Sequence, residues 1–474
     1  MKQTALIALG ALILALPSAK ASGAWTLQGV EYRVDTLEHY VAGPATTVTV
    51  LDLLEPVDSI RQRVWISTTD VTSPLVEVKT VCGSNIRTSN MTVPKMAESR
   101  KGDGNIYFLG VNADLFSTNG PIGTSIMNGE VLKTAKESTA WKAVGVEDDG
   151  KLYFGSARVS FSAKLNGVME YAPSLVNVPR AANECVLYTR RWGSTTRTTE
   201  GETGIEIVLR PVDGILHSDG PTECTVEAAP VKNGGNTLLC IGMGTVASHI
   251  KDLGLMKAGD KYTITPAGTS ITTSAYSSHS FSKITEMCGG DPMLLVGGEM
   301  LASYATMPNY NARRPRTAIG TDESREKMYL LVVDGDKFNR GISAGVDAKD
   351  LAAMMKAIGC HDALNFDGGG SSIMYTSISG TLNRPSDGKD RAVRNGWFLT
   401  TPDKGDRELA SMAFAAPHVT MEIGDTFTPV FYGYNNSGVL INKNLDGVPL
   451  EAPAELGTVS ADGKTLTVTG DGTY

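Results

Sequence analysis

The stretch Asn365-Phe366-Asp367-Gly368-Gly369-Gly370-Ser371-Ser372 decides how the rest of the chain is interpreted. It follows the apolar pair Ala363-Leu364, so it predicts a strand that ends in a polar loop. Glycine loses more backbone entropy on folding than any other residue, so three glycines between a carboxylate and two hydroxyls indicate a close approach to the backbone. Bare N–H groups suit an anion or a sugar. A plain surface turn is the alternative.

The segments before this loop predict the strands and the helix that position it. Residues 328–334 form an apolar run that ends in Asp334, as a strand buried on both faces does. Residues 348–358 carry apolar side chains at helical spacing, and the next strand is expected at 362–366. Strand, helix and strand with this spacing predict a right-handed crossover between parallel strands. Asp334 and Asp367 would then share one edge of a sheet, where open α/β sheets place their ligands.

These segments resemble the phosphodiester glycosidase family, and blocks in the family's order carry the resemblance across about residues 25–402. The blocks are 111–116 with 120–123, 315–320, 333–335 with 343–345, 363–374 and, more weakly, 391–396. Leu115 stands where the family more often has phenylalanine. The resemblance implies an α+β catalytic domain over 22–402, with a mixed sheet and helices, whose β-rich middle portion spans 175–285.

The two ends of the chain differ from this domain in composition. Residues 5–16 are apolar but too short to span a bilayer, and small residues follow at 19–21. We expect a signal peptide over 1–21, cleaved after Ala21, and a secreted or periplasmic protein without a transmembrane anchor. Residues 407–474 alternate apolar and polar positions, which predicts an immunoglobulin-like β-sandwich. The segment is shorter than the roughly 100 residues usual for that fold, as a truncated copy would be. Deleting this segment should leave catalysis largely intact.

The net charge and the cysteines limit the ligands and cross-links that the chain is expected to have. The formal net charge is −8 and no basic run occurs, so nucleic acid is not an expected partner. Six cysteines allow pairing in an exported chain, with Cys224–Cys240 and Cys288–Cys360 as the two suggested disulfides and buried free thiols as an equal alternative. The spacing of cysteines and histidines matches no zinc motif.

The chemistry of a sugar 1-phosphodiester suggests which side chains matter. A phosphomonoester leaving group has a second pKa of about 6, so the site must stabilise its charge more than it must protonate it. An oxocarbenium-like transition state requires a carboxylate as nucleophile or as base for water. The candidate catalytic residues are Asp114, Asp334 and Asp367. The candidate substrate-binding residues are Asn112, Arg316, Thr317, Asn365, Gly368, Gly369, Gly370, Ser371, Ser372, Arg391 and Asn395. Among them, Arg316 is the expected main phosphate partner.

Each of the main candidates also has an ordinary structural explanation. Arg316 fits a surface ion pair, Asp114 a strand-end cap and Asp334 a turn aspartate. The resemblance implies a hydrolase that cleaves the C1–O bond of a sugar 1-phosphodiester, such as a GlcNAc-1-phosphodiester on a phosphorylated glycan, without a cofactor. The alternatives are an envelope module that binds phosphoglycans without cleaving them, and a phosphodiesterase that holds Mg²⁺ or Ca²⁺ on the three aspartates.

Overall fold

The computed structural model describes residues 22–136, 141–165, 169–171, 173, 175–180, 184–193, 204–231, 238–243, 257–272, 279–281, 284–301, 310–335, 341–415 and 421–470. Three β-sheets form the body of the molecule. The nine-stranded sheet runs in the order β1 (Ser22–Leu27), β2 (Val30–Gly43), β3 (Thr46–Leu54), β4 (Arg61–Asp70), β25 (Lys327–Val333), β24 (Arg316–Thr321), β26 (Asp362–Asn365), β22 (Met293–Val296) and β23 (Glu299–Met300).

The other two sheets lie beside it. The five-stranded sheet runs β28 (Gly380–Thr381), β27 (Met374–Thr376), β6 (Asn105–Asn112), β29 (Asn395–Pro402) and β5 (Glu77–Cys82). The thirteen-stranded sheet runs β10 (Glu130–Lys133), β9 (Ser125–Met127), β21 (Glu286–Gly290), β11 (Lys142–Val146), β12 (Leu152–Leu165), β19 (Lys261–Thr272), β17 (Thr222–Val231), β16 (Gly204–Pro211), β18 (Leu238–Met243), β15 (Val186–Tyr188) and β14 (Leu175–Val176), with β13 (Met169–Tyr171) on β12 and β20 (His279–Phe281) on β19. A short hairpin joins β7 (Phe116–Ser117) to β8 (Gly120–Pro121).

The expected α+β fold, with helices forming the catalytic domain, is wrong. Among the described residues, the α-helices are α1 (Val93–Glu98) and α3 (Ala348–Ala357), with a 3₁₀ turn, η2, at Gly369–Ser371. The sheets pair almost entirely antiparallel. Strands, not helices, therefore cover most of the core.

The predicted strand, helix and strand exist as β25, α3 and β26, but the two strands are not neighbours. β24 lies between them and runs antiparallel to both. The physical reason is local, because β24 forms a hairpin with β25 and leaves only its other edge for β26. Since β25 and β26 still run in one direction, Asp334 and Asp367 follow the same end of the sheet, as the sequence predicted.

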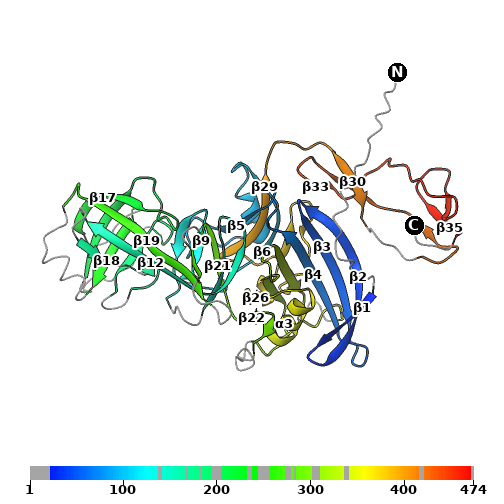
Figure 1. Ribbon diagram of the computed structural model, residues 1–474, viewed down its shortest axis with the longest axis horizontal. Helices are drawn as coiled ribbons and strands as arrows, with labels where there is room; N and C mark the ends of the chain where they lie inside the picture. Colours follow the sequence, from blue (N-terminus) through cyan, green and yellow to red (C-terminus); the bar gives the residue numbers. More distant parts are fainter. Residues whose placement is uncertain are drawn as a thin grey trace, which may run out of the picture.

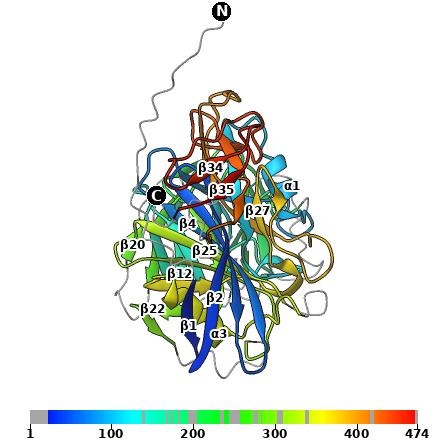
Figure 2. The same ribbon diagram turned by 90° about the vertical axis from the view of Figure 1, so that its right-hand side faces the viewer.

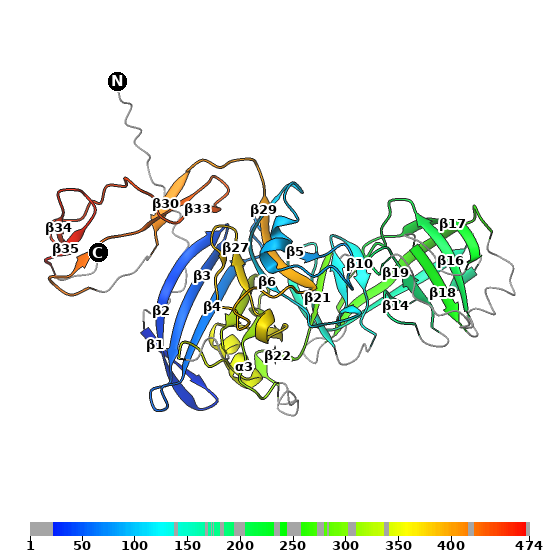
Figure 3. The same cartoon turned by 180° about the vertical axis from the view of Figure 1, so that it is seen from behind.

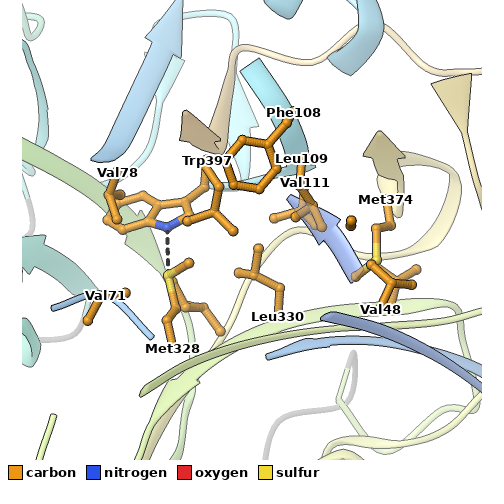
Figure 4. Close-up of a cluster of buried hydrophobic side chains, with 14 of the residues drawn as sticks. Val48, Val71, Val78, Phe108, Leu109, Val111, Met328, Leu330, Met374 and Trp397 are labelled. Carbon is orange, nitrogen blue, oxygen red and sulfur yellow. Dashed lines mark hydrogen bonds between the residues drawn. The ribbon is translucent and has the colours of Figure 1, made fainter. Parts of the chain in front are cut away.

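The two faces of the nine-stranded sheet are both buried. Leu351, Met354 and Met355 of α3 pack on one face, and the helix starts at Asp347, whose side chain accepts a bond from the N–H of Asp350. Figure 4 shows the other face, where side chains of the nine-stranded sheet meet those of the five-stranded sheet, with the Trp397 indole donating to Met328 Sδ at 3.3 Å. This second core holds β6 and β27 close to the ends of β24 and β26.

The molecule is elongated. Figure 1 shows β12 and β17–β19 in a lobe at one end, and Figure 3 shows the same arrangement from behind, with α3 in the central body. The C-terminal segment, 407–474, lies at the other end beside β2 and β3, the end that faces the viewer in Figure 2. No helix among the described residues is long and apolar enough to cross a membrane.

The C-terminal segment contains two small antiparallel sheets. One consists of β30 (Ser411–Phe414), β32 (Phe431–Tyr434) and β33 (Leu440–Asn442), and the other of β31 (Thr426–Phe427), β35 (Leu466–Val468) and β34 (Gly457–Val459). The immunoglobulin-like assignment stays a prediction, as does the signal peptide at 1–21, which lies outside the described residues.

Both suggested disulfides are wrong. Cys224 lies on β17 and Cys240 on β18, with β16 between them. Strands separated by a third strand lie about 10 Å apart, too far for a disulfide. Cys288 and Cys360 are free thiols buried in the cores on opposite faces of the nine-stranded sheet.

Candidate functional site

Three distant segments meet where β26 ends. The Asp367 N–H donates to the Ala113 carbonyl at 2.8 Å, and the Asn112 amide donates to the Asp367 carbonyl at 2.6 Å. Asn112 Oδ1 accepts bonds from the Thr317 hydroxyl at 2.8 Å and from the Ile373 N–H at 3.1 Å. Asn112 and Thr317 are therefore part of the framework that joins β6, β24 and the glycine loop, and their polar atoms are occupied by that task.

Asp367 is one of two carboxylates that this framework brings together. It is partly exposed, and burial raises its pKa, while the Ser371 hydroxyl, the charge of Arg391 and the Gly368 N–H lower it. The charge of Asp367 in turn raises the pKa of Asp114. The two carboxylates therefore interact across the junction of β6 and β26.

Asp114 is almost fully buried, at 1% exposure, and its carboxylate is held on both oxygens. The Gly123 N–H donates to Oδ2 at 2.6 Å, and the Trp141 indole donates to Oδ1 at 2.9 Å. The Asp114 N–H donates to Asn395 Oδ1 at 3.0 Å. Burial raises the pKa of Asp114, whereas these two carboxylate bonds lower it. A plain strand-end cap would not gather partners from such distant segments.

Each glycine of the loop has a structural reason, either its backbone conformation or close packing. Gly369 adopts a φ of +62°, which favours glycine. A Cβ on Gly368 would lie 2.8 Å from the Pro315 carbonyl oxygen, and one on Gly370 would lie 2.2 Å from Arg391 Nη2. The space around Gly369 is open.

The N–H groups of the loop are largely engaged, contrary to the expected anion cradle. Gly368 donates to the Asp367 carboxylate, and Gly369 donates to the Pro315 carbonyl at 2.9 Å. Ser371 and Ser372 donate to carbonyls of the loop itself, each at 3.2 Å. The loop therefore presents its side chains and its close-packed backbone rather than a row of free amides.

The two predicted arginines have different surroundings. Arg316 is buried, and it donates from Nε to the Val346 carbonyl at 3.1 Å and from Nη2 to the Ala312 carbonyl at 2.9 Å. Arg391 is 41% exposed in its side chain, bonds Asp387 at 2.8 Å and reaches the Ser371 hydroxyl at 3.4 Å. Arg391 lies beside the Asp367 carboxylate, and its charge lowers the pKa of that group.

Asp334 and Asn365, two further predicted residues, hold neighbouring backbone in place through hydrogen bonds. Asp334 accepts bonds from the Asn383 amide at 3.0 Å and from the Arg384 N–H at 2.9 Å, and burial raises its pKa to about 6. Asn383 also donates to the Ser372 carbonyl at 2.9 Å, so this contact fixes the far end of the glycine loop. Asn365 donates to the Asp291 carbonyl at 2.7 Å.

The donors for a metal ion do not converge. Asp334 is bonded to the 383–384 turn, and only Asp114 and Asp367 interact with each other. In the part of the chain that the structure describes, no group of three histidine, cysteine or acidic side chains is arranged to hold a metal. The site residues thus offer two carboxylates and one arginine, not the three-aspartate ligand set.

Sequence reasoning missed Trp141, Lys133 and Asn383. Trp141 and Lys133 lie between the first family-like block and the β-rich middle portion, where nothing in the local sequence sets them apart from core residues. Asn383 lies in a short turn with Arg384 and Pro385, and its contacts with Asp334 and the Ser372 carbonyl give it a role. Pairwise contacts of this kind cannot be inferred from spacing along one chain.

Residues 231–400 match the model of the phosphodiester glycosidase family, which confirms the resemblance and covers Asp367 and Arg391 but not Asp114. An uncharacterized SPbeta prophage-derived protein of Bacillus subtilis, YomE, is 35% identical over 103 residues, which is 22% of this chain and 15% of that protein.

Two solved structures share the fold. A hypothetical protein from Synechocystis aligns with a TM-score of 0.56 and 17% identity over 75% of this chain and 62% of that one. A protein of Burkholderia pseudomallei aligns with a TM-score of 0.51 and 16% identity over 72% and 74% of the two chains. At this level of identity, the likeness concerns the fold alone.

Proposed function

From the phosphodiester glycosidase region that this chain carries at residues 231–400, we propose that the protein hydrolyses the C1–O bond of a sugar 1-phosphodiester. The observation that carries the proposal is the junction of β6 and β26. There a partly exposed Asp367 interacts with a buried Asp114, while Arg391 reaches the serine that bonds Asp367. Two carboxylates and one cation match a reaction with a positive sugar ring and an anionic leaving group.

Each of the three side chains has a role in this proposal. Asp367 attacks C1 or takes the proton of the attacking water, because it is the more exposed carboxylate. Asp114 stabilises the positive charge that develops on the ring. Arg391 binds the phosphoryl oxygens with its planar donors and stabilises the departing phosphomonoester. Arg316 donates to the backbone carbonyls of Val346 and Ala312 and has a structural role instead.

The substrate class and location are the finer parts of the proposal. The resemblance supports a GlcNAc-1-phosphodiester-like substrate on a phosphorylated glycan, and residues 5–21 support export from the cytoplasm. No cofactor has a role in the reaction as proposed. The binding module without catalysis remains the main competing function, and the metal-dependent phosphodiesterase is disfavoured because no three acidic side chains converge among the described residues.

Product analysis of one reaction tests the three functions together. A GlcNAc 1-phosphodiester should yield free reducing sugar and a phosphomonoester. Sugar 1-phosphate as the product would mean P–O cleavage by a phosphodiesterase, and an intact but bound substrate would mean a binding module.

The essential carboxylate has its own test. Asp367→Asn removes the charge with little change in shape and should lower kcat at least about 10²-fold, as expected for the loss of a general base. The matched control is Asp446→Asn, at an exposed position of the C-terminal segment, which should leave kcat unchanged. Full activity of Asp367→Asn would contradict the assignment.

A further inference from the structure

We infer that the buried ammonium group of Lys133 favours the ionised form of the Asp114 carboxylate, acting through the single peptide group between Ile122 and Gly123. The inference concerns the second carboxylate of the site and therefore rests on the proposed function for its catalytic meaning. Lys133 is a positioning residue in this scheme, because it acts through another residue and not on the substrate.

The geometry of this peptide group is the main argument. Lys133 Nζ donates to the Ile122 carbonyl oxygen at 3.0 Å, and the Gly123 N–H donates to Asp114 Oδ2 at 2.6 Å. The carbonyl of Ile122 and the N–H of Gly123 belong to the same peptide unit. A cation at the carbonyl end polarises that unit and strengthens the bond that its N–H makes to an anion, because linked hydrogen bonds reinforce one another at low dielectric.

The peptide group has little room to move. A Cβ on Gly289 would lie 2.5 Å from Asp114 Oδ2 and 2.6 Å from the Gly123 Cα, so the backbones of β21 and the 123 turn pack directly around the carboxylate. Asp114 is therefore locked between this peptide, the Gly289 backbone and the Trp141 indole. Because this carboxylate cannot move toward water, its adjacent hydrogen-bond donors and charges set its pKa.

Lys133 is the cation beside Asp114, and after the Trp141 and Gly123 hydrogen bonds its charge is the next influence that lowers the pKa of Asp114. Lys133 is 4% exposed, so taking its ammonium out of water is costly unless negative charge or acceptors compensate. The titratable groups that face Asp114 are Asp367 and the thiols of Cys82 and Cys288. Burial raises the pKa of both thiols, which keeps them neutral near pH 7. Lys133 supplies the positive charge in this set, and it lowers the pKa that burial raises in Asp114.

A purely structural role for Lys133 is the competing explanation. Its ammonium also donates to the Thr134 carbonyl at 3.3 Å, so it satisfies two buried carbonyls as well. The two explanations differ in what they predict for a neutral side chain at this position. A structural lysine affects folding stability only, whereas the proposed role shifts the titration of Asp114.

The titration can be observed directly through Trp141, whose indole N–H is bonded to Asp114 Oδ1. The full chain is labelled with 5-fluorotryptophan, the Trp141 ¹⁹F resonance is assigned with Trp141→Phe, and its shift is followed against pH. Lys133→Met should move the midpoint of the Trp141 transition upward by at least about one pH unit, since one pKa unit corresponds to only ~1.4 kcal/mol. Lys356→Met, which removes an exposed lysine of α3, should leave the midpoint unchanged.

A second variant, Lys133→Gln, tests the inference if Lys133→Met does not fold. The pH profile of kcat/KM separates the inference about Asp114 from the proposed hydrolase function. Lys133→Gln retains a donor for the Ile122 carbonyl without the charge and should shift the midpoint as Lys133→Met does. A midpoint that stays at the wild-type value in the folded variants, or a Trp141 resonance that titrates in none of them, would overturn the inference. If the midpoint moves but no C1–O cleavage is found, the inference about Asp114 stands and the proposed function falls. If both hold, the acidic limb of kcat/KM should move with the resonance.

Discussion

Arg391 and Arg316 show how local partners decide what an arginine can do. Both lie within blocks that resemble the glycosidase family, and sequence reasoning preferred Arg316 as the phosphate partner. The structure places backbone carbonyls around Arg316 and leaves Arg391 partly exposed beside Ser371. The preference therefore moves to Arg391.

Conservative replacement of each arginine tests this reassignment. Arg391→Lys keeps the charge but loses the planar set of donors, and it should lower kcat/KM for the phosphodiester about 10- to 100-fold, the worth of one or two charged hydrogen bonds. The kcat/KM of Arg391→Lys for an aryl glycoside without phosphate should fall much less. Arg316→Lys should instead lower the unfolding temperature, because one ammonium group cannot replace both planar donors to the Val346 and Ala312 carbonyls. Equal losses on both substrates in Arg391→Lys would assign Arg391 a structural role.

The glycine loop is the element on which the site depends most directly. Gly370 and Gly369 provide a matched pair of substitutions. Gly370→Ala would bring a methyl group to 2.2 Å from Arg391 Nη2, so the arginine must move. Gly369→Ala meets open space and pays only the cost of its φ of +62°, roughly 1–2 kcal/mol.

We expect Gly370→Ala to reduce kcat/KM for the phosphodiester at least tenfold, about the worth of one charged hydrogen bond. Gly369→Ala should lower the thermal stability but leave kcat/KM within about threefold, since it leaves Arg391 in place. Steady-state kinetics together with thermal unfolding of both variants measure the two effects. Kinetics that rank the variants in the opposite order would show that the open side of Gly369 contacts the substrate.

At the level of strands, Glu286 links β21 to β5. Its Oε2 accepts the Thr80 N–H at 2.8 Å and its Oε1 accepts the Asn128 N–H at 3.1 Å, and burial raises its pKa to about 7. A carboxyl group whose pKa is raised by folding favours the folded state most at low pH, where the group is protonated in both the folded and the unfolded protein. Its contribution is lost as the pH rises from about 4.5, the ordinary value, to about 7.

The free energy of unfolding should therefore fall between pH 5 and pH 7.5, by up to about 3 kcal/mol from Glu286 alone. In Glu286→Gln the same decrease should be smaller, although Asp334, whose pKa is raised to about 6, still contributes in the same direction. Urea unfolding at the two pH values measures the difference. An identical pH dependence in both proteins would show that Glu286 does not titrate with folding.

At the scale of the whole molecule, the C-terminal segment is attached to the body more firmly than its sequence indicated. The core cluster that contains Tyr40 also includes four buried residues of the C-terminal segment, Tyr432, Tyr434, Val439 and Leu440. The rings of Tyr40 and Tyr432 meet edge to face, with centroids 5.5 Å apart at 80°. A pocket of about 550 Å³ lies between the C-terminal segment and the body, lined by residues such as Ile106, Ile378 and Leu440.

Two truncations should therefore differ. Removing 407–474 exposes the apolar surface around Tyr40 and should lower the unfolding temperature by several degrees, since each fully buried large apolar side chain contributes roughly 1.5–3 kcal/mol. Removing only 446–474 keeps β32 and β33 in place and should have a smaller effect. Calorimetry of both proteins decides the point, and equal unfolding temperatures for them would mean that β32 adds no stability to the body.

The sequence by itself determined β25, α3 and β26 within a residue or two, and the common direction that brings Asp334 and Asp367 to one end of the sheet. Apolar periodicity and helix caps are local properties, so they can be read along the chain. The pairing of β24 between β25 and β26, the carbonyls around Arg316 and the Lys133–peptide–Asp114 contact were decided only by the tertiary structure. Each depends on residues brought together from separate turns and strands, and such contacts arise from the packing of several sheets around shared cores.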